Sequence, residues 1–381
     1  MVTGTPLYIT SADALDKAVA KMSGAPLVAV DLEADSMYHF TEKVCLLQMA
    51  ANRSCFIIDP LALTDLSALA PLFADSAIVK IFHGADYDVR SLYRDFGFHI
   101  ENLFDTELAC RFLGYSHSSL EAVLKKHFDV VLDKKYQKKD WSIRPLPEEM
   151  IAYAADDVRY LADLYRKLSA ALAEKDRLGW VIETCEDLCR VRSGENNDVD
   201  RPLFMNIKGA GRLDPQSLAV LEKLAQFRQN AAEKKDRPPY KIMSNSAMLD
   251  LAQKKPENTA RLHRSGILSK KQCQMYGDTI IQAVTDALDM SEEALPVYPK
   301  TKKHPVSPAV TRRIDALKQW RKSKAGQLEI DPAMLINNAV IQKIAGEAPQ
   351  SVGDLKSIDT LKNWQIDAFG EQWIDVMAKT G

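Results

Sequence analysis

This chain is built around the segment Leu27-Val28-Ala29-Val30-Asp31-Leu32-Glu33, an apolar run that ends in two acids. The apolar run predicts a strand that is buried on both faces. Asp31 and Glu33 lie two residues apart, so their carboxylates point to the same side of an extended chain. Like charges repel there and are costly to desolvate, which favours a divalent cation bound by both. The competing interpretation is a strand that frays into solvent at Asp31, and only further acids downstream can decide between the two.

The charge distribution divides the chain into two halves. With 381 residues, 46% of them apolar, the chain is long enough for two or three globular domains. Residues 1–200 carry 22 Lys and Arg against 32 Asp and Glu, whereas residues 201–381 carry 28 against 20. An acidic half followed by a basic half suggests metal-binding acids in front and polyanion contacts behind; ordinary surface charge is the alternative.

The cysteines and the apolar profile bear on where the protein works. No basic stretch followed by an apolar core opens the sequence, so no signal peptide is expected. Cys185 and Cys189 are spaced for one helix face, but no second Cys or His pair completes a zinc site. We therefore expect free thiols in a cytoplasmic protein. No apolar stretch approaches about 18 residues, so no membrane span is expected.

The apolar periodicity of residues 1–192 predicts an α/β domain with a mixed sheet. The expected strands are 7–9, 27–33, 44–49, 55–58 and 78–82. The expected helices are 12–22, 66–73, 86–96, 106–112, 120–127 and one long helix over 148–167. The second to fourth strands follow one another through short connections, which implies antiparallel pairing. The alternation of strand and helix that follows makes the sheet mixed.

The remainder of the chain contains an internal repeat. A gap-free offset of 93 residues pairs Phe227 with Trp320 and Arg228 with Arg321, and matches apolar and turn residues over some sixty positions. We therefore expect two copies of a small all-α domain, at residues 213–292 and 308–381. Residues 193–212 and 293–307 are the expected linkers.

Further acids arrive at positions where they could join the first pair. Asp88 follows the turn at Gly84 that ends the strand 78–82, and Tyr153 and Asp157 lie four residues apart on one helix face. Each acid alone is more typical of a structural residue. Together they form an ordered set: a strand Asp-x-Glu, an Asp after a strand and turn, and a helical Tyr-x-x-x-Asp.

This ordered set resembles the three exonuclease motifs of the DEDD superfamily, in its tyrosine-bearing branch. His83-Gly84-Ala85, Phe104-Asp105-Thr106 and the segment from Gln137 to Leu146 are similar to the ribonuclease D family. The helical repeat resembles the HRDC domain shared by that family and RecQ-type helicases. The second copy diverges at Gly326-Gln327, where a longer basic loop is expected. The resemblance implies a ribonuclease H-like mixed sheet followed by two HRDC-like domains.

The resemblance also implies a chemistry. Asp31, Glu33, Asp88 and Asp157 would be the ligands of two Mg²⁺ or Mn²⁺ ions about 4 Å apart. Tyr153 would orient the attacking water. The expected activity is metal-dependent 3′–5′ exoribonuclease cleavage, which releases nucleoside 5′-monophosphates from RNA, tRNA precursors in particular.

Other residues are candidates for contact with RNA. Tyr38 could stack on a terminal base, with packing of its loop as the alternative. His83 could contact the scissile region or satisfy a backbone group. Gln137, Lys138 and Arg144 belong to a basic segment that could guide the phosphate backbone, although such a run is often a solvated surface. Further candidates in the repeats are Lys234, Lys235, Lys254, Lys255, Arg261, Arg264, Lys270 and Lys271, with solubility as the competing account.

Two alternative functions remain open at this point. A DNA 3′–5′ exonuclease would use the same acids, because the residue that senses the 2′-hydroxyl is not evident from sequence. A non-catalytic RNA-binding protein would carry vestigial acids, against which the complete set argues. A monomer is expected, since one chain holds all the site residues.

Overall fold

The computed structural model describes residues 4–192, 201–299 and 307–380 and divides into two compact units. The first unit comprises residues 1–34, 44–193 and 305–381, and the second comprises residues 35–43 and 194–304. Residues 193–200 and 300–306, which belong to the two predicted linkers, lie outside the described residues.

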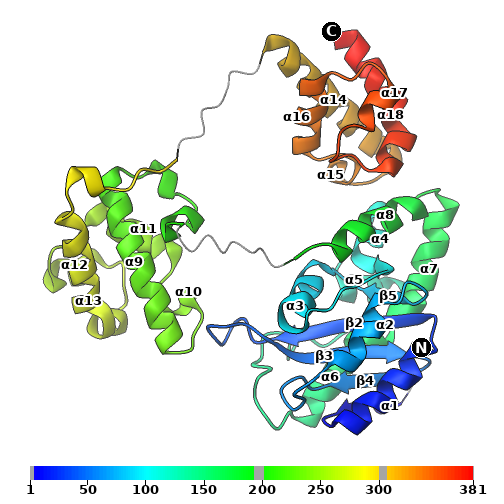
Figure 1. Ribbon diagram of the computed structural model, residues 1–381, viewed down its shortest axis with the longest axis horizontal. Helices are drawn as coiled ribbons and strands as arrows, with labels where there is room; N and C mark the ends of the chain where they lie inside the picture. The colour runs from blue at the N-terminus through cyan, green and yellow to red at the C-terminus, as the bar shows by residue number, and fades with distance from the viewer. Residues whose placement is uncertain (1–3, 193–200, 300–306, 381) are drawn as a thin grey trace. The chain divides into compact units, whose positions relative to one another are not determined.

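The first unit contains a six-stranded mixed sheet in the order β1-β4-β3-β2-β5-β6 (Figure 1). Its strands are β1 (Leu7–Ile9), β2 (Leu27–Ala34), β3 (Val44–Ala51), β4 (Ser54–Ile58), β5 (Val79–Phe82) and β6 (Leu103–Asp105). Only β3 runs against the others, because it pairs antiparallel with both β2 and β4 while the remaining pairs are parallel. The predicted mixed sheet is confirmed, and the carboxyl ends of β2, β4, β5 and β6 lie at one edge.

Helices pack against this sheet. They are α1 (Ala12–Ser23), α2 (Ala70–Ala74), α3 (Asp86–Phe96), α4 (Thr106–Phe112), α5 (Leu120–Phe128), α6 (Glu148–Arg159), α7 (Leu161–Glu174) and α8 (Leu178–Cys189). The prediction of one helix over 148–167 is wrong, because the helix is interrupted at Tyr160, which separates α6 from α7. The break leaves no trace in the apolar pattern, since Val158, Leu161 and Leu164 continue one buried face across it.

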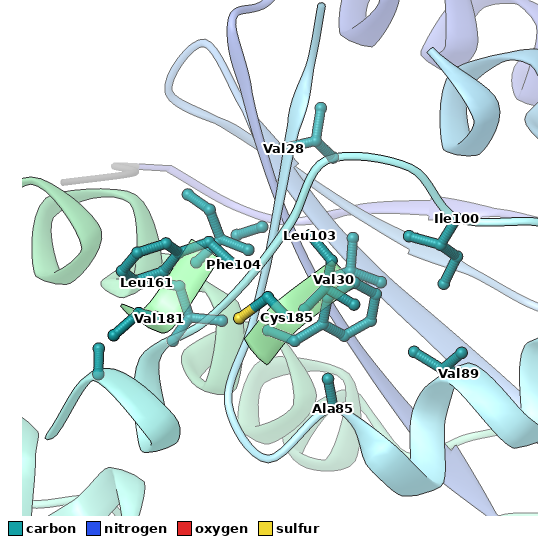
Figure 2. Packing of buried hydrophobic residues seen from close by; sticks show 14 of the residues in the cluster. Val28, Val30, Ala85, Val89, Ile100, Leu103, Phe104, Leu161, Val181 and Cys185 are labelled. Atoms are coloured by element: carbon teal, nitrogen blue, oxygen red, sulfur yellow. The ribbon is translucent and has the colours of Figure 1, made fainter. Parts of the chain in front are cut away.

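The apolar run of β2 anchors the core. Val28 and Val30 are fully buried, and Figure 2 shows them in one cluster with Val89 of α3, Leu103 of β6 and Cys185 of α8. Because side chains alternate along a strand, Asp31 and Glu33 point away from this cluster, to the opposite face. The buried run therefore holds the acid pair in place.

The second helical repeat belongs to the first unit and packs against α8 (Figure 1). It consists of α14 (Pro308–Leu328), α15 (Pro332–Leu335), α16 (Asn338–Glu347), α17 (Val352–Leu355) and α18 (Asn363–Thr380). The Trp180 ring stacks on the Trp364 ring with centroids 4.6 Å apart. The Glu183 carboxylate accepts hydrogen bonds from the backbone amides of Asn363 (2.6 Å) and Trp364 (2.9 Å).

The second unit is built on the first helical repeat. It consists of α9 (Pro215–Lys234), α10 (Pro239–Ile242), α11 (Asn245–Lys254), α12 (Thr259–Ser265) and α13 (Lys270–Leu288). Within the predicted linker 193–212, Leu203–Asn206 and Ala210–Arg212 form two 3-10 helices, and Phe204 and Ile207 of this segment are buried in the core of the unit. The loop 35–43 also packs here, where Asp236 accepts hydrogen bonds from His39 and the Phe40 amide.

The two repeats have the same internal contacts at the offset of 93 residues. Phe227 meets Tyr276 edge to face, with ring centroids 5.5 Å apart, as Trp320 meets Phe369 at 5.4 Å. Likewise, the side-chain amide of Gln272 donates to the Ile242 carbonyl, and the side-chain amide of Gln365 donates to the Leu335 carbonyl. The predicted repeat is therefore a structural one. None of the helices among the described residues is both long and apolar enough to span a bilayer.

The stack of Trp364 on Trp180 predicts a large loss of stability when it is removed. Trp364 is 5% exposed, so Trp364→Ala is expected to lower the free energy of unfolding by about 3–5 kcal/mol. The measurement is urea denaturation followed by circular dichroism. Ile182→Ala is the matched control, because this side chain of α8 is exposed and its loss is expected to cost less than about 0.5 kcal/mol. Equal losses in both variants would contradict the packing described.

Candidate active site

The first two acids lie where β2 runs past its parallel neighbour. β2 pairs with β5 only as far as Ala29, whereas its pairing with β3 continues through Asp31 and Glu33. Among the described residues, no strand therefore pairs with Asp31 and Glu33 on the side of β2 that faces β5. Both side chains are half-buried, at the edge of the sheet where β5 ends.

The third acid, Asp88, is positioned by a turn that the Asp105 carboxylate stabilises. Asp88 is buried in the first turn of α3, which follows Gly84 with its positive φ of 82°. The Asp105 carboxylate accepts hydrogen bonds from the amides of Gly84 and Ala85, both at 2.9 Å. Asp105 thereby fixes the turn that leads into α3. Sequence reasoning gave this residue no role of its own; its position at the start of the helix 106–112 was the available signal, because an acid there caps a helix.

The remaining two residues come from α6, which contacts β2, β3 and β4. Tyr153 and Asp157 lie one turn apart on this helix, as predicted from their spacing. The Tyr153 ring packs against Tyr136 and Trp141, with centroids 5.8 and 6.0 Å away. Trp141 is itself buried, so the Tyr153 ring rests against the core of the domain. A pocket of about 330 Å³ opens beside Tyr153 and Asp157, and Lys135 and Tyr136 form part of its wall.

The four carboxylates interact electrostatically with one another. Burial raises the pKa of Asp31 to about 7 and that of Asp157 to about 8, where the charge on Asp31 adds to the effect. The pKa of Glu33 is also raised well above its usual value, by burial first and then by repulsion from Asp31, Asp157 and Asp88. Burial and Asp31 likewise raise the pKa of Asp88. Asp31 acts on each of the other three, so it lies at the centre of the set.

Hard divalent cations fit this set of donors. Within the described ranges, no Lys, Arg or His side chain forms an ion pair with any of the four carboxylates. In the same part of the chain, no three His, Cys, Asp or Glu side chains converge into a ready-made ion cage. A site without such a cage is compatible with Mg²⁺, which typically takes one or two carboxylates and completes its coordination shell with water and substrate phosphate. The residues therefore fit ions whose coordination the substrate completes.

Arg144, predicted to contact substrate, is used inside the protein instead. Its guanidinium forms a bidentate ion pair with Asp59, at 2.7 and 2.8 Å. Its remaining N–H groups donate to the carbonyls of Cys45, Trp141 and Ile143. Because a guanidinium has five donors, none is left for a phosphate in this structure, which argues against the predicted contact.

The structure is less decisive about the other predicted contacts. His83 is bonded through Nδ1 to the Thr106 hydroxyl at 2.9 Å, and burial lowers its pKa. Gln137 and Lys138 are exposed on the turn beside the pocket residues Lys135 and Tyr136. Tyr38 lies on the loop 35–43, where Lys241 sits 4.4 Å from the centre of its ring. Substrate contact by these residues stays a prediction.

Comparison with known proteins agrees with the fold and the domain order. The family model of a 3′–5′ exonuclease matches residues 6–173, and the HRDC domain model matches residues 217–284 and 310–377. The chain is 29% identical to the ribonuclease D of Bartonella henselae, over 96% of this chain and 88% of that protein. It is 31% identical to the ribonuclease D of Desulfotalea psychrophila, over 88% and 89% of the two chains. The crystal structure of Escherichia coli RNase D shares the fold, with a TM-score of 0.71 and 23% identity over 99% of both chains.

The domain that contains the mixed sheet matches the 3′–5′ exonuclease model, and two HRDC domains follow it. This combination defines the class of the protein: a 3′–5′ exonuclease of nucleic acids. The similarity to bacterial ribonucleases D extends over nearly the whole chain, which identifies the family within this class. The chain belongs to the ribonuclease D family and is a 3′–5′ exoribonuclease.

The raised pKa values predict how pH and metal act on stability. In the metal-free protein, Asp31 and Asp157 keep protons that the unfolded chain releases near pH 4, so the folded state binds more protons. Stability should therefore fall as pH rises from about 4 through about 8. Because a cation favours the ionised carboxylates, Mg²⁺ should raise the melting temperature more at about pH 8 than at about pH 5.

Thermal melts with Mg²⁺ and with EDTA at the two pH values measure this effect. The control is the double variant Asp31→Asn, Asp157→Asn, in which the response to Mg²⁺ should be lost. A shift of the same size in wild type and variant would show that Mg²⁺ acts elsewhere.

Proposed function

We propose that Asp31, Glu33, Asp88 and Asp157 bind two divalent cations, Mg²⁺ or Mn²⁺, at which the terminal phosphodiester of RNA is hydrolysed. The observation that supports this most is the mutual repulsion of four carboxylates that no cationic side chain of the described residues pairs with. Exonucleases of this family depend generally on divalent metal ions. Asp31, which interacts electrostatically with all three other acids, would be the central ligand of this set.

The side chains divide the work around the reacting phosphate. When bound, the ions would supply an activated water and stabilise charge on the leaving 3′ oxygen. The pKa of Tyr153 is raised by burial and by Asp157, Glu33 and Asp31, so its phenol keeps its proton near neutral pH. Tyr153 is therefore suited to orient the water by hydrogen bonding and is a poor general base. Tyr136 and Trp141 hold the ring in place for this purpose.

We further propose that the substrates are structured RNAs with 3′ extensions, including tRNA precursors, and that the products are nucleoside 5′-monophosphates. E. coli RNase D, whose crystal structure shares this fold, is an exoribonuclease involved in structured RNA processing. In this proposal, the HRDC domains hold the folded body of the RNA while its 3′ tail enters the site. The protein would act as a monomer, because one chain supplies every residue of the site. Its free cysteines favour the cytoplasm as the place where it acts.

Removal of single acids tests the metal site. Asp31→Asn and Asp88→Asn should each lower the turnover rate on a 3′-extended tRNA by roughly a thousandfold or more, because each weakens the binding of an ion at the reacting centre. Asp86→Asn is the matched control: this neighbouring acid of α3 is exposed and paired with Arg90, so turnover should stay near that of wild type. The measurement is release of mononucleotides with Mg²⁺, with Mn²⁺ and with EDTA.

Three outcomes would count against the proposal. Wild-type rates in Asp31→Asn would contradict the assignment of ligands. Faster digestion of single-stranded DNA than of RNA would favour a DNA substrate. Binding of RNA without cleavage under every metal condition would make the acids vestigial.

A further inference from the structure

The two helical repeats differ in charge on one matching surface. At the offset of 93 residues, Lys235, Arg237, Lys241 and Lys271 of the first repeat correspond to Leu328, Ile330, Met334 and Trp364 of the second. The interiors of the repeats keep the same contacts, so the matching of these positions is structural as well as sequential. One surface is therefore cationic in the first repeat and apolar in the second.

In the second repeat, this surface is covered by the exonuclease domain. Trp364 stacks on Trp180, and the Leu328 carbonyl accepts a hydrogen bond from Arg177. The Glu183 carboxylate occupies the beginning of α18, where the amides of Asn363 and Trp364 donate to it. This contact shows what the first turn of the last helix of a repeat binds in this protein: an anionic group with two oxygen acceptors.

In the first repeat, the same place is an open pocket of about 560 Å³. Its wall includes the four cationic residues, all of them exposed, together with Tyr276 and Ser269. The amides of Lys270 and Lys271 correspond to those that Glu183 binds in the second repeat. They have no hydrogen-bond acceptor among the residues that the structure describes. The Ser269 hydroxyl accepts from the backbone amide of Gln272, and the Ser269 carbonyl accepts from that of Cys273.

The charge of this pocket is not neutralised by a neighbouring acid. No Asp or Glu lines it. Asp236, which lies between two of the cationic residues in sequence, is bonded instead to the His39 ring (2.7 Å) and the Phe40 amide (3.0 Å) of the loop 35–43. Lys235 is oriented by a hydrogen bond to the Tyr276 hydroxyl (2.8 Å).

We propose that this pocket of the first HRDC domain binds phosphates of the RNA backbone, upstream of the 3′ end that is being trimmed. The proposal rests on the proposed function, which supplies RNA as the ligand. Four cations around two free amides at a helix N-terminus match the charge and the acceptor oxygens of a phosphodiester better than those of a single carboxylate. Lys241 also contacts Tyr38, on the loop that continues the acid-bearing strand β2, so the pocket adjoins that loop.

The test compares two double variants of the full chain that each lose two positive charges. Arg237→Gln with Lys271→Gln removes pocket cations whose side chains form no hydrogen bond, ion pair or cation–π contact with other residues that the structure describes. Lys208→Gln with Arg212→Gln removes exposed cations that lie outside the pocket. Both are made in the Asp31→Asn chain, so that a 3′-extended tRNA stays intact while its affinity is measured over a range of salt concentrations.

The pocket variant should bind the RNA roughly tenfold more weakly at low salt, with a salt slope smaller by about one to two, because two phosphate contacts are lost. The control variant should bind within about twofold of its parent. Equal affinity and slope in the two double variants would overturn the proposal. Unchanged RNA binding combined with lost binding of a polyglutamate peptide would overturn it in favour of an acidic protein segment.

The outcome is separable from a failure of the proposed function. Release of mononucleotides by the wild-type chain tests the exonuclease site, whereas the affinity measurement needs no cleavage. Thermal melts of the two double variants check that both are folded as well as their parent is.

Discussion

The repulsion among four carboxylates is the interaction on which the rest of the structure depends. Asp31, Glu33, Asp88 and Asp157 come from three elements that are far apart in sequence, and each would be more stable in water than beside the others. Packing elsewhere holds them together: the buried run of β2 fixes the first two, the turn at Gly84 fixes the third, and α6 carries the fourth. The apolar core thus maintains a cluster of carboxylates whose repulsion is relieved by bound protons in the metal-free protein and would be relieved by an added cation.

The sequence predicts those parts of the fold that leave a local pattern. The buried strand, the acid pair on one side of it and the helical spacing of Tyr153 and Asp157 are each visible in a window of a few residues. The break at Tyr160 is invisible, because the apolar face continues through it. The partner of Arg144 is equally hidden, since Asp59 lies 85 residues away and a basic residue in a basic run looks like a ligand for phosphate. Side-chain partners distant in sequence decide such cases, and no short-range signal reports them.

The helical repeat illustrates how one fold accommodates two uses. The residues that two copies must share are those that build the bundle, such as the aromatic pairs at Phe227 and Trp320, and these set the offset seen in the sequence. Surface residues carry no such constraint. The start of the last helix faces cations in one copy and the exonuclease domain in the other, so a duplicated module has been fitted to two different neighbours.

The discontinuity of the first unit has a consequence for the order in which the protein is made. Trp180 and Glu183 of α8 are synthesised long before α18, which covers them, and the whole first helical repeat emerges from the ribosome in between. Because domains generally fold as units during synthesis, the first repeat can become compact while the exonuclease domain still lacks its cover. The apolar face of α8 is therefore exposed to solvent or to chaperones for the time that translation of nearly two hundred residues requires.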